Sequence, residues 1–212
     1  MHALAAGIAV MIAAPKFTQP PERPLQVAFI VSENANVMDL AGAWEVFQDT
    51  MCGNTAPFRL YTVAETRAPI RMAGGLQMVP DHTFDDAPAP SVVVIGAQSG
   101  KSPKMIGWLR RMTVESEVVM SVCTGAFKLA LTGALRGKKA TTHHEYFDEF
   151  AKQNPEVQVE RGSRFVQSDA RIFTAGGLTS GIDLALHVVE LYFGREVASK
   201  TARYMEYESA RW

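Results

Sequence analysis

The chain has 212 residues, which is enough for one substantial domain and short for two. Apolar residues make up 47% of it and charged residues 20%, so the composition excludes a disordered chain and a membrane bundle. The formal net charge is −1 and positive charges are scattered, so we expect no nucleic-acid partner. The two cysteines, Cys52 and Cys123, lack metal-type spacing, and we expect no disulfide framework, metal or cofactor.

Residues 1–15 form an uncharged apolar run that is too short to span a bilayer and ends in the small residues Ala13 and Ala14. A proline-rich polar spacer follows at 16–24. This signal-like pattern favours export to the periplasm, although no basic segment precedes the run. The alternative is an N-terminal helix lying on a cytoplasmic domain. In both cases we expect the domain at 25–212 and no stable insertion into a membrane.

Strand-like and helical patterns alternate along the domain, which predicts an α/β fold with a mostly parallel sheet and helices on both faces. Apolar, β-branched runs predict strands at 25–31, 58–64, 91–96, 118–123, 139–142, 164–167 and 171–174. Amphipathic patterns predict helices at 39–51, 103–114, 124–131, 145–151 and from 180 onward. Gly74 and Gly75 separate two short segments, which is typical of a hairpin. Ser180 and Asp183 have the spacing of a helix capping box.

The most informative segment is the strand that ends at Cys123. An apolar, β-branched run leads to this cysteine, and a helical pattern starts directly after it at Thr124 and Gly125. The thiol is therefore expected at a strand-to-helix turn, where the first helix amides and the positive end of the helix favour a thiolate. This is typical of a nucleophile elbow. The alternative is a buried structural cysteine, because cysteine packs as a small hydrophobic residue.

Four signals follow strands of the predicted sheet: Asp39, the pair Gly96 and Ala97, Cys123, and His143. Open parallel sheets bind ligands beyond the carboxyl ends of their strands, so these residues predict one site. Asp39 alone could instead be a helix N-cap, and His143 could be a structural residue at a strand end.

Two further patterns predict packing rather than ligands. In an extended segment His143 and His144 would point to opposite sides, which argues against a two-histidine metal site. The glycines at 176, 177 and 181 lack the spacing of a phosphate-binding loop, so they indicate close packing around the last helix.

Five blocks, in this order and spacing, resemble the DJ-1/PfpI superfamily over roughly residues 25–205. The blocks are Asp39-Leu40-Ala41-Gly42, Ile95-Gly96-Ala97, Ser121-Val122-Cys123-Thr124-Gly125, Ala140-Thr141-Thr142-His143 and residues 176–183. The resemblance implies a flavodoxin-like three-layer sandwich with Cys123 at the elbow, and a homodimer. The first block looks more like isonitrile hydratases and the sensor domains of AraC-type regulators than like DJ-1 itself.

The resemblance to isonitrile hydratases implies a reaction of a small-molecule isonitrile with water that gives an N-substituted formamide. Cys123 would be the nucleophile, Asp39 the acid and His143 a partner of the cysteine. Amides after Gly96 at Ala97, and at Thr124, would bind developing negative charge. Ala97 stands where the family has glycine, and His144 stands where isonitrile hydratases often have tryptophan, which implies a more polar pocket wall and a different substrate.

Two other functions fit the same residues. The first is a small-molecule sensor domain like those of AraC-type regulators, without a DNA-binding region, since no helix-turn-helix pattern follows in these 212 residues. The second is a glyoxalase-like or redox-responsive stress protein, in which a low-pKa Cys123 is oxidised to a sulfinate.

Overall fold

The computed structural model describes residue 16, residues 21–209 and residue 212. The apolar segment 1–15 and residues 17–20 of the spacer lie outside the described residues, and the prediction of export lies outside them too. In the part of the chain that is described, no helix has both the length and the apolar character needed to cross a membrane.

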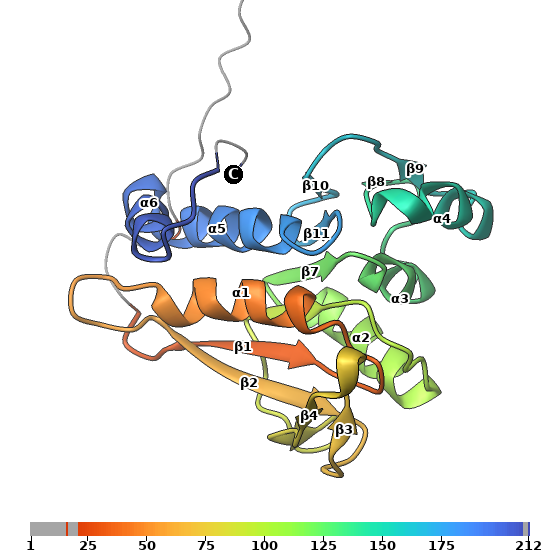
Figure 1. The fold of residues 1–212 in the computed structure, drawn as a ribbon, viewed down its shortest axis with the longest axis horizontal. Helices are drawn as coiled ribbons and strands as arrows, with labels where there is room; N and C mark the ends of the chain where they lie inside the picture. The colour runs from red at the N-terminus through yellow and green to blue at the C-terminus, as the bar shows by residue number, and fades with distance from the viewer. Residues whose placement is uncertain (1–15, 17–20, 210–211) are drawn as a thin grey trace, which may run out of the picture.

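A seven-stranded sheet lies at the centre of the fold, in the order β10-β11-β7-β6-β1-β2-β5 (Figure 1). Neighbouring strands are parallel except for the antiparallel pair β10 and β11. The strands are β1 (Leu25–Ile30), β2 (Phe58–Ala64), β5 (His82–Thr83), β6 (Val92–Ile95), β7 (Val118–Val122), β10 (Phe165–Gln167) and β11 (Ile172–Ala175). Two small pairs lie outside this sheet: β3 (Ile70–Arg71) with β4 (Gln77–Met78), and β8 (Lys139–Ala140) with β9 (Gln158–Val159).

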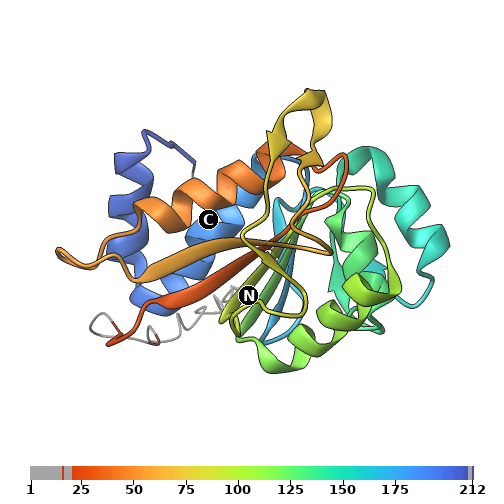
Figure 2. The ribbon, with the colours of Figure 1, turned by 90° about the horizontal axis from the view of Figure 1, so that it is seen from below.

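Helices cover both faces of the sheet (Figure 2). One layer contains α1 (Val37–Asp49), α5 (Ser180–Phe193) and α6 (Arg195–Tyr204), and the other contains α2 (Pro103–Glu115), α3 (Gly125–Leu131) and α4 (Phe147–Gln153). Alternate side chains of β1 face the two layers: Val27 and Phe29 pack with α1 and α5, whereas Ala28 and Ile30 pack with α2 and α3. The predicted three-layer α/β sandwich of flavodoxin-like type is therefore confirmed.

The hairpin expected around Gly74 and Gly75 is present as β3 and β4, joined through the short 3-10 helix η1 (Ala73–Gly75). Both glycines have positive φ, 76° and 91°, which suits residues without a side chain. The strand expected at 139–142 is shorter and lies outside the main sheet. It pairs as β8 with β9, which the pattern did not predict because each strand has only two residues.

The predicted last helix is two helices. Gly194 separates α5 from α6 with φ 85° and ψ 165°, a conformation that ends the first helix. The capping box expected at its start is absent, because Thr179 is the N-cap and makes no side-chain capping bond. Asp183 is fully buried and instead accepts hydrogen bonds from Arg164, Tyr207 and Ser209.

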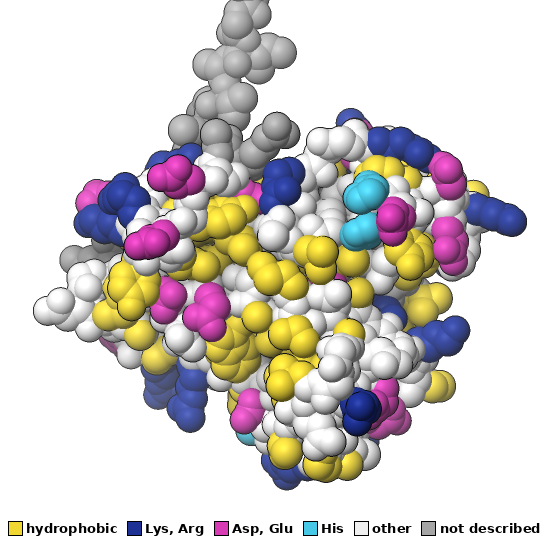
Figure 3. Space-filling model, in the orientation of Figure 1, with side chains coloured by type: hydrophobic (Ala, Val, Ile, Leu, Met, Phe, Trp, Pro, Cys, Tyr) yellow, Lys and Arg dark blue, Asp and Glu magenta, His cyan; other side chains and the backbone are white. Residues whose placement is uncertain are grey.

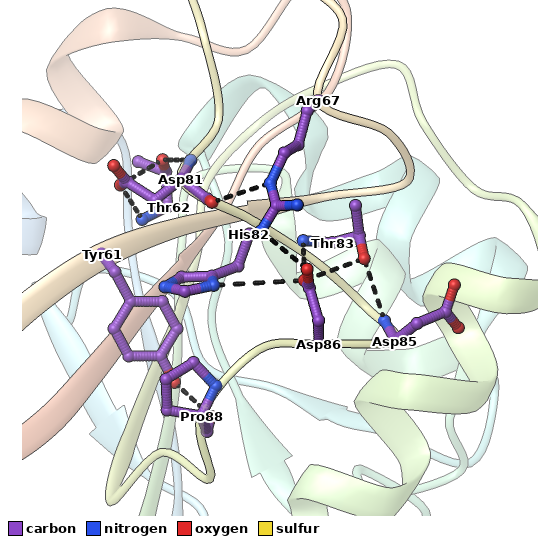
Figure 4. Close-up of polar contacts among 9 residues, drawn as sticks. All are labelled: Tyr61, Thr62, Arg67, Asp81, His82, Thr83, Asp85, Asp86 and Pro88. Carbon is purple, nitrogen blue, oxygen red and sulfur yellow. Dashed lines mark hydrogen bonds and ion pairs between the residues drawn. The ribbon is translucent and has the colours of Figure 1, made fainter.

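A polar cluster holds the short edge strand β5 against β2 (Figure 4). The amide and hydroxyl of Thr62 each donate a 2.8 Å hydrogen bond to Asp81, and the amide of Thr83 donates one of 2.7 Å to Asp86. Nδ1 of His82 lies 4.0 Å from a carboxylate oxygen of Asp86. His82 therefore belongs to the packing of the edge strand β5, away from Cys123 and Asp39.

Candidate active site

Cys123 occupies the turn between β7 and α3, as predicted. Its φ is 59°, a conformation that side chains rarely adopt, and its amide donates to the carbonyl oxygen of Gly176 at 2.8 Å. A side chain on Gly125 would overlap the carbonyl oxygen of Ile95, so glycine lets α3 start directly beside β6. The cysteine is only 7% exposed. The backbone therefore fixes the thiol at a strained and enclosed elbow.

Asp39 lies inside the first turn of α1. Asn36 is the N-cap of this helix, and its side chain accepts from the amides of Met38 and Asp39 at 3.0 and 3.3 Å. The alternative in which Asp39 caps the helix is therefore wrong. Its side chain is fully buried, and Oδ2 accepts a 2.8 Å hydrogen bond from the amide of Ala97. A Cβ on Gly96 would come within 2.8 Å of the Cβ of Asp39, so this glycine makes room for the carboxyl group.

The fold brings the carboxyl group of Asp39 and the thiol of Cys123 together, close enough for each to shift the pKa of the other. The amide of Leu178 lies against both groups. Oδ1 of Asp39 is buried and has no hydrogen-bond partner among the described residues. This oxygen is therefore available to the thiol and to a ligand.

Burial raises the pKa of Asp39, while the amide of Ala97 opposes this shift. Burial and the charge of Asp39 raise the pKa of Cys123 from 9.0 to about 11, against the amides of Thr124 and Leu178. The predicted effect of the helix amides is present, but burial outweighs it. The thiol and the carboxyl group consequently titrate as a pair, and the thiolate is favoured only when Asp39 holds the proton.

His143 lies close enough to this pair for its charge to lower the pKa of Asp39. A side chain on Gly177 would overlap the ring of His143, so this glycine makes room for the histidine. The rings of His143 and His144 stack at 4.5 Å with an interplanar angle of 25°. The expectation that they point to opposite sides is wrong, because the 3-10 helix η2 (His144–Tyr146) starts immediately after His143. Across the described residues, no group of three His, Cys, Asp or Glu could hold a metal ion.

The two amides predicted to bind negative charge differ in their surroundings. The amide of Thr124 faces the thiol, whereas that of Ala97 is bonded to Asp39. The amide of Leu178 also faces the thiol. Leu178 was not predicted, because it acts through its backbone and its side chain gives no signal. Its φ is 53°, a conformation that is rare for leucine, and in the sequence only the neighbouring glycines mark this loop as unusual.

Thr141 and Thr142 form hydrogen bonds that hold the turn at Cys123 and the neighbouring strand β11 in place. The hydroxyl of Thr142 donates a 2.9 Å hydrogen bond to the carbonyl oxygen of Cys123, and the amide of Thr141 donates one of 2.8 Å to the hydroxyl of Thr174. The close packing predicted for the glycine loop is confirmed, since a Cβ on Gly181 would lie 3.0 Å from the side chain of Val122.

Comparison with known families is consistent with this geometry. The sequence pattern of the DJ-1/PfpI family matches residues 25–191. The chain belongs to the DJ-1/PfpI family. It is 30% identical over 191 residues to the isonitrile hydratase of Pseudomonas putida, covering 88% of this chain and 80% of that protein. It is 26% identical over 200 residues to the HTH-type transcriptional regulator GbdR of Pseudomonas aeruginosa, covering 91% of this chain but only 54% of the regulator.

Solved structures agree with this assignment. A ThiJ/PfpI family protein from Pseudomonas syringae superposes with a TM-score of 0.76 at 25% identity, covering 98% of this chain and 83% of that one. An AraC family transcriptional regulator from Pseudomonas putida has the same fold, with a TM-score of 0.74 at 17% identity, covering 86% of this chain and 100% of the solved chain.

Proposed function

We propose that this DJ-1/PfpI protein is a cysteine-dependent hydratase that converts an isonitrile and water to an N-substituted formamide. The observation that carries the proposal is the buried carboxyl group of Asp39 beside the elbow thiol of Cys123, with one carboxyl oxygen left without a partner in the described chain. The 30% identity to an isonitrile hydratase, over 80% of its length, supports the same reaction.

The reaction starts when the proton of the pair resides on Asp39 and Cys123 is a thiolate. The sulfur attacks the terminal carbon of R–N≡C, Asp39 protonates that carbon, and a thioimidate R–N=CH–S forms. A water molecule then adds its hydroxyl group to the carbon and a proton to the nitrogen. Asp39 takes the hydroxyl proton as the C–S bond breaks, which releases R–NH–CHO and restores the starting pair. The amides of Thr124 and Leu178 stabilise the negative sulfur as it forms and leaves.

The direct test is to incubate the protein with cyclohexyl isonitrile and to detect N-cyclohexylformamide by mass spectrometry. We expect turnover by the native protein and by Cys52→Ala, and none by Cys123→Ala with an unchanged circular dichroism spectrum. Cys52 is the matched control because it is the other free cysteine in the structure. Absence of turnover by the native protein across a panel of isonitriles and 2-oxoaldehydes would overturn the enzymatic proposal, including its glyoxalase-like variant.

A second candidate is a small-molecule sensor without turnover. Two observations favour it: the chain resembles transcriptional regulators over about half of their length, and burial with Asp39 raises the pKa of Cys123 to about 11. A protonated thiol is a poor nucleophile, so such a site could bind a ligand and leave it intact. Calorimetric binding of an isonitrile or 2-oxoaldehyde with no product formed would select this function.

We also propose that the protein is a homodimer. Hydrophobic side chains gather across the middle of the face drawn in Figure 3, in the region of α1 and α5 in Figure 1. Exposed apolar patches of this kind are typical of interfaces between subunits. Light scattering at micromolar concentration should give twice the chain mass of 23.2 kDa. A mass equal to that of one chain would contradict the proposal.

A further inference from the structure

A cavity of about 330 Å³ lies beyond the carboxyl ends of β1, β2 and β6, and the reaction proposed above does not use it. The loops that follow these three strands line it, with Ser32, Glu33, Glu65, Ser99 and Gly100. Neither Cys123 nor Asp39 lines it. The cavity is therefore separate from the candidate active site.

The order of the strands favours a ligand at this place. β1 lies between β2 and β6, because the chain pairs β2 on one side of β1 and later places β6 on the other. The helices that follow β1 and β6, which are α1 and α2, cover opposite faces of the sheet. Open α/β sheets bind ligands beyond the carboxyl ends of the strands at such a point, where the direction of winding reverses. The cavity occupies this position.

The inner wall of the cavity is apolar. Val31, Ala64, Ile70 and Met105 contribute to it, and each is at most 7% exposed. The first three belong to a small core beneath the hairpin of β3 and β4, which lies beside the carboxyl end of β2 (Figure 1). None of the described residues that line the cavity is aromatic. The wall can therefore cover a short aliphatic chain, but it offers no aromatic face.

Hydrogen bonds hold the loops after β1 and β6 together. The amide of Gly100 donates a 2.9 Å hydrogen bond to the hydroxyl of Ser32, and the amide of Ser99 donates one of 2.9 Å to the carbonyl oxygen of Glu33. A Cβ on Gly100 would come within 2.5 Å of the hydroxyl of Ser32, so the two loops pack tightly there. This side of the cavity is thus formed by fixed segments.

Two carboxylates, those of Glu33 and Glu65, line the cavity. Both residues come shortly after the paired positions Ile30 and Val63, so they leave neighbouring parallel strands side by side. The amide of Arg71 lies 3.3 Å from each carboxylate oxygen of Glu33 and donates to this group, which orients it. Within the described residues, neither glutamate forms an ion pair with a lysine, arginine or histidine.

The basic side chains around the cavity do not neutralise these carboxylates. Two of them are held in other ion pairs, Arg67 with Asp86 at 2.6 Å and Lys104 with Asp85 at 2.5 Å. The guanidinium group of Arg71 lies against Gly75, where a Cβ would come within 3.2 Å of Nη2. Lys101 follows the loop after β6 but does not line the cavity. In the described part of the chain, the cavity therefore carries two negative charges and no positive side chain.

We propose that this cavity binds a small organic cation, with a primary ammonium or guanidinium group on a short aliphatic chain. Glu33 and Glu65 accept hydrogen bonds from the cation, and the apolar wall covers its chain. A quaternary ammonium group has no N–H donor and is favoured by aromatic cages, which this wall lacks, so it binds more weakly. The volume lies at the lower end of the range for small-molecule sites, about 300 to 1,000 Å³. The inference does not depend on the chemistry of Cys123.

The test is an NMR titration of the ¹⁵N-labelled protein at about pH 7 with n-butylammonium, n-butylguanidinium and n-butyltrimethylammonium chloride. We expect at least one of the first two to shift the amide signals of Ser32, Glu33 and Gly100, with a dissociation constant of about 10 mM or lower. The trimethylammonium compound should bind at least about fivefold more weakly than this ligand. The tighter of the two N–H cations identifies which group the cavity takes.

A double variant tests the role of the two carboxylates. In Glu33→Gln/Glu65→Gln the affinity for the N–H cation should fall by about tenfold or more. Glutamine keeps an oxygen that can accept from the amide of Arg71, and both glutamates are exposed, so thermal unfolding should show that the variant folds. Glu45→Gln/Glu206→Gln is the matched control. It removes the same charge from two exposed positions outside the cavity and should leave the affinity unchanged.

Three results of these titrations would overturn the proposal. They are the absence of shifts with both N–H cations, equal affinity in the native protein and in the double variant of the cavity, and binding of the trimethylammonium compound as tight as that of the N–H cations. Calcium chloride is titrated in parallel, because carboxylates also bind divalent cations. Displacement of butylammonium by calcium at an equal or lower concentration would make this a metal site and would also overturn the proposal. None of these measurements requires turnover of an isonitrile.

Discussion

The amide of Ala97 donates a 2.8 Å hydrogen bond to Oδ2 of Asp39, and this contact joins the loop after β6 to the first turn of α1. The bond fixes the carboxyl group and leaves Oδ1 for the thiol. Ala97 is not among the residues with positive φ, so alanine fits here where the family usually has glycine. The departure from the family pattern therefore leaves the position of the acid intact.

Asp39→Asn should remove the catalytic acid and leave the nucleophile Cys123 in place. We expect turnover of isonitrile to fall by about 10² to 10⁴, because the amide cannot donate the carboxyl proton. The same change removes a charge that raises the pKa of Cys123, so that pKa should fall below about 11 and alkylation by iodoacetamide at pH 8 should become faster. Glu45→Gln, an exposed change on the same helix, should alter neither rate. Turnover that survives in Asp39→Asn would show that another group is the acid.

The raised pKa of Cys123 also predicts how stability depends on pH. In the unfolded chain the thiol ionises near its ordinary pKa of 9.0, whereas in the folded protein it keeps its proton up to about 11. The folded state therefore binds more protons between these values, and the contribution of Cys123 to the free energy of unfolding falls as the pH rises through this window. The loss is about 2 to 3 kcal/mol at its limit. Denaturant unfolding from pH 8 to 11 should show it as a difference between the native protein and Cys123→Ser, which does not titrate there. A constant difference would contradict the raised pKa.

Most of the fold could be predicted because each long element has its own pattern. β2 spans Phe58–Ala64 as expected, since aromatic and β-branched residues fill most of this segment and Pro57 and Glu65 stand at its two ends. The two-residue strands β5 and β9 could not be predicted, because pairing partners rather than local sequence define them. The break at Gly194 was missed because helical patterns continue on both sides of this single glycine.

The parts of the candidate site that are formed by side chains could be predicted from the sequence. The positions of Asp39 and Cys123 follow from the rule that carboxyl ends of parallel strands meet at one edge of a sheet. Leu178 could not be found, since it contributes a backbone amide and sits at a positive φ that the sequence does not mark. The stacking of His143 on His144 was also missed, because it depends on where an extended segment turns into a 3-10 helix.

Gly177→Ala should disturb the site without unfolding the protein. The new methyl group would overlap the ring of His143, so the histidine or the loop that carries Leu178 must move. We expect turnover to fall by about tenfold or more, since displacements of about 1 Å can cost this much. Gly107→Ala is the matched control: it lies within α2 with no atom close to the new methyl group, and it should stabilise the helix by about 0.5 to 1 kcal/mol. Equal turnover in both variants would mean that the position of His143 does not matter.

Replacing Arg164 tests whether the buried carboxylate of Asp183 stabilises the fold and the loop that contains Leu178. Asp183 is fully buried, and Arg164 binds both this carboxylate and the hydroxyl of Thr179, the residue after Leu178. Among the described residues, Arg164→Met leaves the carboxylate with the hydroxyl donors Tyr207 and Ser209, and it should lower the free energy of unfolding by about 3 to 5 kcal/mol. Arg161→Met is the control, because it breaks an exposed pair with Asp148 and should cost no more than about 1 kcal/mol. Urea unfolding measures both. Similar losses in the two variants would mean that the buried pair adds little, and that the glycine packing around His143 and Val122 alone holds the loop against the reactive thiol.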